Sequence, residues 1–140
     1  MYYIAILLVI VSNVIYHIIQ KITPSKINPF LILLITYSVA AIVCGVIFVL
    51  FPGDGGIPGA VKKVSWTSVA LGLAIIGLEL GFLLAYRAGW NISVAALLAN
   101  AAVGILLVVV GVLFFRDKLS PSNILGIVLT ITGLILINKK

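Results

Sequence analysis

Apolar residues along the chain gather into five long runs, and the segments between them hold most of the charged and helix-breaking residues. A helix rises about 1.5 Å per residue and a bilayer core is about 30 Å thick, so a run of roughly twenty residues can span it. The pattern predicts an all-α fold, a polytopic membrane protein with a five-transmembrane-helix bundle in one domain over 1–140. The expected helices cover residues 2–20, 29–51, 66–87, 92–115 and 121–138.

Residues with a known preference for helix ends mark the boundaries of these runs. Ser and Asn favour the N-cap, proline the first helical position, and glycine the position after a helix ends. The segment 52–64 is rich in Gly and Pro, and we expect an exposed loop there. The predicted end residues are Asn28 before Pro29, Ser65, Asn91, Ser120 before Pro121, and Gly89 after Arg87.

Composition supports insertion into a bilayer, because 64% of the residues are hydrophobic, 9% are charged and the mean hydropathy is +1.38. The net charge of +6 does not indicate nucleic acid, since Lys and Arg lie at the ends of apolar runs, as interfacial anchors do. The single cysteine, Cys44, excludes an intrachain disulfide. The first run lacks a basic leader and a small-residue cleavage site, so we expect a retained helix rather than a signal peptide.

Glu79 lies near the middle of the run 66–87. An ionised carboxylate at membrane depth costs a few kcal/mol or more, so it must be shielded by other helices, paired, exposed to an aqueous cavity or protonated. Each of these solutions places Glu79 inside the protein. An intramembrane acid is therefore a candidate functional group.

Polar side chains on three of the runs repeat at helical spacing and form stripes. We predict that these stripes enclose a cavity for a polar or cationic small molecule, with Glu79 also carrying a coupling proton. Asparagines also hydrogen-bond between packed helices, a histidine near a helix end also reaches the interface, and tyrosines also anchor at the interface. The predicted substrate-binding residues are Glu79, Asn13, His17, Asn100, Tyr16 and Tyr86.

Small residues at spacings of three or four favour close helix packing or dimerisation. Such faces are formed by Gly77 and Gly81 and by Gly126, Thr130 and Gly133. One His, one Cys and three acids form no catalytic arrangement, metal-ligand cluster or phosphate-binding glycine motif. The sequence thus predicts no enzyme, no metal and no cofactor.

The last third of the chain carries a recognisable order of motifs. Ala95-Ala96 opens an apolar run, Asp117 and Leu119-Ser120-Pro121 follow it, and Gly126 and Gly133-Leu134-Ile135 lie in the final run. With the preceding AYRAG, this order resembles the last two helices of the EamA-like repeat in the drug/metabolite transporter superfamily. The chain departs from that pattern at Asp117, where the family commonly has Glu, and at 101–103, where it commonly has a proline.

The resemblance implies a transporter assembled from two chains, because most EamA-like transporters are similar to a tandem of two oppositely oriented five-helix repeats and this chain holds one. The related small multidrug resistance proteins are antiparallel homodimers with an essential glutamate in their first helix. This chain has no carboxylate there, so the role of Glu79 rests on its burial. Lys and Arg divide four to five between the two sides of five spans, which favours neither orientation.

We therefore expect a small secondary transporter or exporter, multi-pass in the cytoplasmic (inner) membrane, that acts as a homodimer, parallel or antiparallel, on a small-molecule substrate within the lipid bilayer. An alternative is a non-transporting subunit of a heteromeric complex such as a lipid-carrier flippase. A third is a structural remnant of a repeat, whose stripes face lipid and enclose no cavity.

Overall fold

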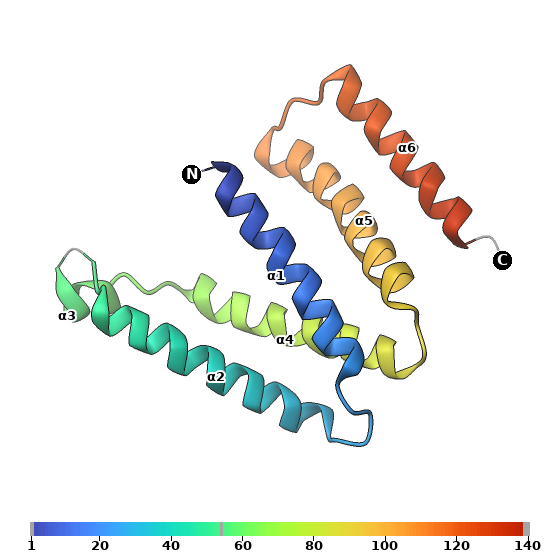
Figure 1. Cartoon of the computed structure of the whole chain (residues 1–140). Coiled ribbons are helices and arrows are strands. Elements are labelled where there is room, and N and C mark those ends of the chain that lie inside the picture. The colour runs from blue at the N-terminus through green and yellow to red at the C-terminus, as the bar shows by residue number, and fades with distance from the viewer. Residues whose placement is uncertain (1, 54, 139–140) are drawn as a thin grey trace. The chain divides into compact units, whose positions relative to one another are not determined.

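The computed structural model describes residues 2–53 and 55–138, and within these ranges the chain is helical with no strand (Figure 1). Asp54, Lys139 and Lys140, which the sequence places in a loop and at the C-terminal boundary, lie outside the described residues. The elements in order are α1 (Tyr2–Ile22), α2 (Pro29–Leu50), α3 (Gly56–Val61), α4 (Trp66–Arg87), α5 (Ile92–Val110), a π-helical turn η1 (Gly111–Phe115) and α6 (Pro121–Asn138).

Within residues 2–53 and 55–138, four helices are long and apolar enough to cross a membrane, and α6 is a shorter apolar helix. Large apolar side chains along these helices are exposed, and Leu83 is a fully buried one. Hydrocarbon solvates such side chains, so a helix in lipid does not need a water-excluding core on every face. The chain is therefore an all-α polytopic membrane protein, as the sequence predicts.

The chain divides into two compact units. The first combines the residues up to Ile18 with those from Gly89 onward, and in it α5 and α6 pack against each other. The second is Ile19–Ala88, in which α2 packs against α4. The Glu79 region and the C-terminal end of α4 both belong to the second unit.

Side-chain caps begin three of the helices where the sequence predicts them. Each cap oxygen accepts a hydrogen bond from one of the first backbone N–H groups, which have no partner inside the helix. Asn91 occupies the N-cap position of α5 without a side-chain hydrogen bond. The cap bonds are Asn28 Oδ1 from Phe30 N–H at 2.9 Å, Ser65 Oγ from Thr67 N–H at 3.5 Å and Ser120 Oγ from Asn123 N–H at 3.2 Å, and Gly89 has φ +94° after α4.

Within the connection 52–64, for which the sequence predicts an exposed loop, residues 56–61 form the short helix α3. Gly53, Gly55 and Gly56 have positive φ values and supply the turns that lead into it. Pro58 lies in its first turn, where a missing N–H costs no helical hydrogen bond. Local glycine geometry thus allows one helical turn where composition indicated only a loop.

The C-terminal end of α5 also differs from the continuous α-helix expected to residue 115. Gly111 O accepts hydrogen bonds from the N–H groups of Arg116 and Asp117, the latter at 3.0 Å, which closes a wide π turn. The Asp117 carboxylate covers Gly111, since a Cβ there would lie 2.5 Å from Asp117 Oδ2. The chain leaves the helix through Arg116, whose φ of 59° is left-handed.

Arg116 is therefore predicted to be a strained position. A left-handed conformation costs a non-glycine residue about 1–2 kcal/mol, which glycine avoids. Arg116→Gly and Arg116→Ala remove the same charge, but only glycine relieves the strain. We expect Arg116→Gly to be more stable than Arg116→Ala by about 1 kcal/mol, measured by unfolding in detergent with circular dichroism. Equal stability of the two variants would contradict the strain.

Candidate functional site

Glu79 is half-buried on α4, within the second unit. The packing of α2 against α4 brings the buried Tyr37 hydroxyl near the Glu79 carboxylate, although the hydroxyl forms no hydrogen bond among the described residues. Gln20 Nε2 donates to the backbone carbonyl of Glu79 at 3.4 Å. Glu79, Tyr37 and Gln20 form what we call the Glu79 cluster. It combines a carboxylate, which can bind a cation or a proton, with a phenol that can donate to it.

Tyr37 is a member of this cluster that is absent from the substrate-binding residues predicted from the sequence. Its signal in the sequence is a group of three adjacent hydroxyl-bearing residues, Thr36, Tyr37 and Ser38, within the apolar run 29–51. Spacing within one helix finds residues that share a face, but Tyr37 meets Glu79 across two helices. Their pairing depends on how α2 and α4 are aligned, and the sequence does not display that alignment.

The remaining predicted substrate-binding residues of α1 and α5 belong to the first unit. The rings of Tyr16 and His17 meet edge to face, with centroids 5.1 Å apart and planes at 69°. His17 is 5% exposed, whereas Asn13 and Asn100 are exposed on their helices. Tyr16 and His17 are thus neighbours, and the convergence of these side chains with Glu79 stays a prediction.

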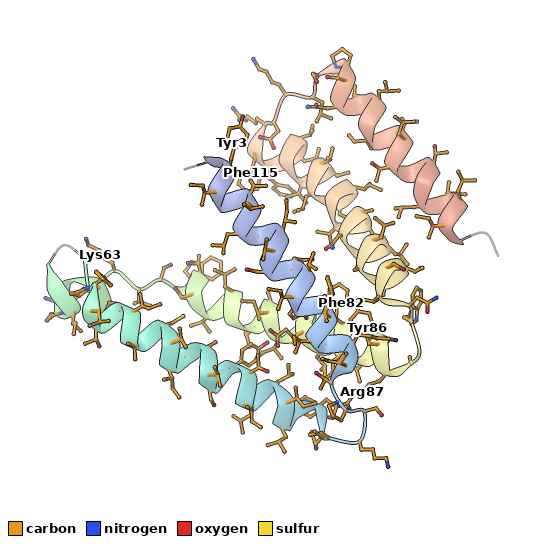
Figure 2. The ribbon with its side chains drawn as sticks, in the orientation of Figure 1. Tyr3, Lys63, Phe82, Tyr86, Arg87 and Phe115 are labelled. Carbon is orange, nitrogen blue, oxygen red and sulfur yellow. The ribbon has the colours of Figure 1, made fainter. Side chains whose placement is uncertain are left out.

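Tyr86 lies at the C-terminal end of α4, where aromatic and basic side chains gather (Figure 2). It is 6% exposed and stacks on Phe82 with centroids 6.0 Å apart. The Lys21 ammonium lies 5.6 Å from the centroid of the Tyr86 ring, a cation–π geometry. Tyr86 is seven residues from Glu79, about 10 Å along the helix axis, and belongs to a second polar region that shares Gln20 with the Glu79 cluster.

A cavity of about 240 Å³ lies at this end of α4. Arg87 fixes one of its walls, because Nη2 donates to the carbonyls of Ile27 at 2.7 Å and Pro24 at 3.4 Å. These bonds tie the α1–α2 connection to α4. We call this cavity the basic pocket; its lining residues are Gln20, Lys21, Thr23, Ser25, Tyr86 and Arg87.

The small-residue faces are open among the described residues. A Cβ added at Gly77, Gly81, Gly126 or Gly133 would meet no atom of these residues within 4 Å, the neighbouring backbone of its own helix apart. Thr130 Oγ1 donates to the Gly126 carbonyl of its own helix at 2.8 Å. The role of these five residues in dimer or helix packing stays a prediction.

The family model of the EamA-like transporter family matches residues 1–139. The chain belongs to the EamA-like transporter family, and the resemblance found in its last two helices is confirmed. The family is one of membrane transporters of the drug/metabolite type rather than enzymes. Comparison with curated proteins and with solved structures gave no match.

The hydrogen bonds of Arg87 predict that it holds the α1–α2 connection in place. Arg87→Met removes two bonds from a charged donor, worth about 1 kcal/mol together at this partly exposed site. Amide hydrogen exchange at 26–28 should then accelerate about fivefold. Lys26→Met, in the same connection, is the matched control and should leave exchange unchanged. Equal acceleration in both variants would exclude this role of Arg87.

Proposed function

We propose that the chain is a small secondary transporter or exporter of a polar or cationic molecule, and that it acts as a homodimer in the cytoplasmic membrane. The observation that supports this proposal is the Glu79 carboxylate, half-buried in a membrane-spanning helix beside the Tyr37 hydroxyl. Acids at membrane depth are costly and typically mark ion or substrate pathways and proton relays.

A single carboxylate supports the exchange of a proton for a cationic substrate, because the proton or the cation must leave before the other binds. With a proton bound, Glu79 is neutral and holds no cation. When the proton leaves to water on one side, the carboxylate binds a cationic substrate, and the cation is released as a proton returns. Because both occupants neutralise the same charge, a monovalent cation and a proton exchange one for one. The nearby Tyr37 hydroxyl is a donor that could stabilise the ionised form.

Two features of the chain support its pairing with a second copy: the small-residue faces and the distribution of Lys and Arg. Small-residue faces on α4 and α6 are open, and such faces let helices approach closely. Lys and Arg are nearly balanced between the two sides, which permits insertion in both orientations. Two oppositely inserted copies would form an inverted repeat, the architecture with which many transporters alternate access to a site near the membrane midplane.

Replacement of the acid tests the mechanism directly. In liposomes with an acidic interior, we expect Glu79→Gln to reduce uptake of organic cations at least about tenfold and to abolish its pH dependence. Tyr37→Phe should reduce uptake less, because the carboxylate remains. The control Asp117→Asn removes an acid outside the spans and should transport normally.

Uptake is measured with a panel of permanently charged organic cations, so that protonation of the substrate does not contribute to the pH dependence of uptake. Normal, pH-dependent uptake by Glu79→Gln would exclude Glu79 as the coupling group. Failure of the native protein to move any member of the panel would contradict the cationic substrate class.

The charge balance makes a separate prediction about orientation. A reporter fused to the C-terminus should be found on both sides of the membrane for the native sequence. Lys62→Gln with Lys63→Gln changes the balance from four against five to two against five, so the reporter should shift to the cytoplasmic side. A single orientation of the native protein, with recovery of a different polypeptide at equal stoichiometry, would favour the heteromeric subunit instead.

A further inference from the structure

The basic pocket lies where the membrane spans end. Its lining side chains come from the last residues of α1, the connection that follows and the last residues of α4. Two of them are cations, Lys21 and Arg87, and the others carry hydroxyl, amide or phenol groups. The volume of about 240 Å³ far exceeds the roughly 30 Å³ that one water occupies in the liquid, so a small polar group fits.

Electrostatics give this pocket a positive sign. Glu79 is the one carboxylate among the described residues of the Ile19–Ala88 unit. It lies eight residues before Arg87 on α4, about 12 Å away along the helix axis. None of the lining residues is acidic. Lys26 adds a third positive charge in the same connection without lining the pocket.

Part of the basic character has a structural explanation, because cations favour the C-terminal ends of helices and Arg87 Nη2 binds two loop carbonyls. That explanation does not account for the Nε atom of Arg87. Arg87 Nε is buried and has no hydrogen-bond partner among the described residues. A buried charged donor without an acceptor is costly, so an acceptor that enters the pocket would be favoured.

We propose that the basic pocket binds a phosphate group, and that the headgroup of an anionic membrane lipid supplies it. Phosphate oxygens accept charge-assisted hydrogen bonds from guanidinium and ammonium groups. Basic pockets at the ends of membrane helices lie at the depth of lipid phosphates. The Lys21 ammonium, held over the Tyr86 ring, and the Arg87 guanidinium are the recognition groups, and the hydroxyls of Thr23 and Ser25 complete the polar lining.

Native mass spectrometry in detergent tests this proposal with two probes, the anionic lipid phosphatidylglycerol and the zwitterionic lipid phosphatidylcholine, whose choline group offsets the charge of its phosphate. We expect the native protein to bind phosphatidylglycerol at least about fivefold more tightly. Lys21→Gln should weaken phosphatidylglycerol binding about fivefold, and Lys21→Arg should retain it. The matched control Lys26→Gln removes the same charge outside the pocket and should change binding by less than about twofold.

Three results would overturn the proposal. Both lipids carry a phosphate, so equal affinity for them would exclude a pocket that selects an anionic headgroup. Equal losses of phosphatidylglycerol binding in Lys21→Gln and Lys26→Gln would reduce the effect to diffuse surface charge. If millimolar inorganic phosphate displaced phosphatidylglycerol, and phosphate binding depended on Lys21, the pocket's ligand would be soluble phosphate rather than a lipid headgroup. Circular dichroism of Lys21→Gln verifies its fold. Glu79→Gln should keep lipid selectivity, which separates this proposal from the transport mechanism.

Discussion

Hydrocarbon offers no hydrogen bonds, and this constraint determines where the chain is helical and how each helix ends. Backbone N–H and C=O groups inside a span must pair within the helix, while those at its ends need a side chain, a turn or water. Asn28, Ser65 and Ser120 satisfy the first turns, and Gly89 redirects the chain after α4. Few polar side chains therefore lie within the spans, and each of them needs its own partner, cavity or function.

The fold class could be predicted from the sequence because the signal is a sum over many residues. Apolar runs of bilayer length and short-range cap chemistry determine the helices without knowledge of the tertiary structure. The short helix α3 and the π turn η1 escaped prediction for the opposite reason. Each depends on a few particular contacts, such as glycines with positive φ and the Asp117 side chain over Gly111, which composition and periodicity do not reveal.

The candidate site could be predicted only in part. The cost of an acid in hydrocarbon was enough to identify Glu79, whereas Tyr37 required the packing of α2 on α4. Lys21 and Arg87 are anchors by sequence, and only the structure shows that they line one cavity. Helix α4 thus carries two regions of opposite charge preference: the acid in its interior suits a cation, and the basic pocket at its end suits an anion.

The π turn at the end of α5 determines how the loss of one residue would change the direction of the side chains that follow it. A π turn is an α-helix that has accommodated one inserted residue, and each residue corresponds to about 100° of rotation. Phe114 and Phe115, which are 77% and 75% exposed, therefore point out of phase with the α5 face that precedes them. Deletion of a single residue in η1 would turn this aromatic pair around the helix axis while the apolar length of the span stayed nearly constant.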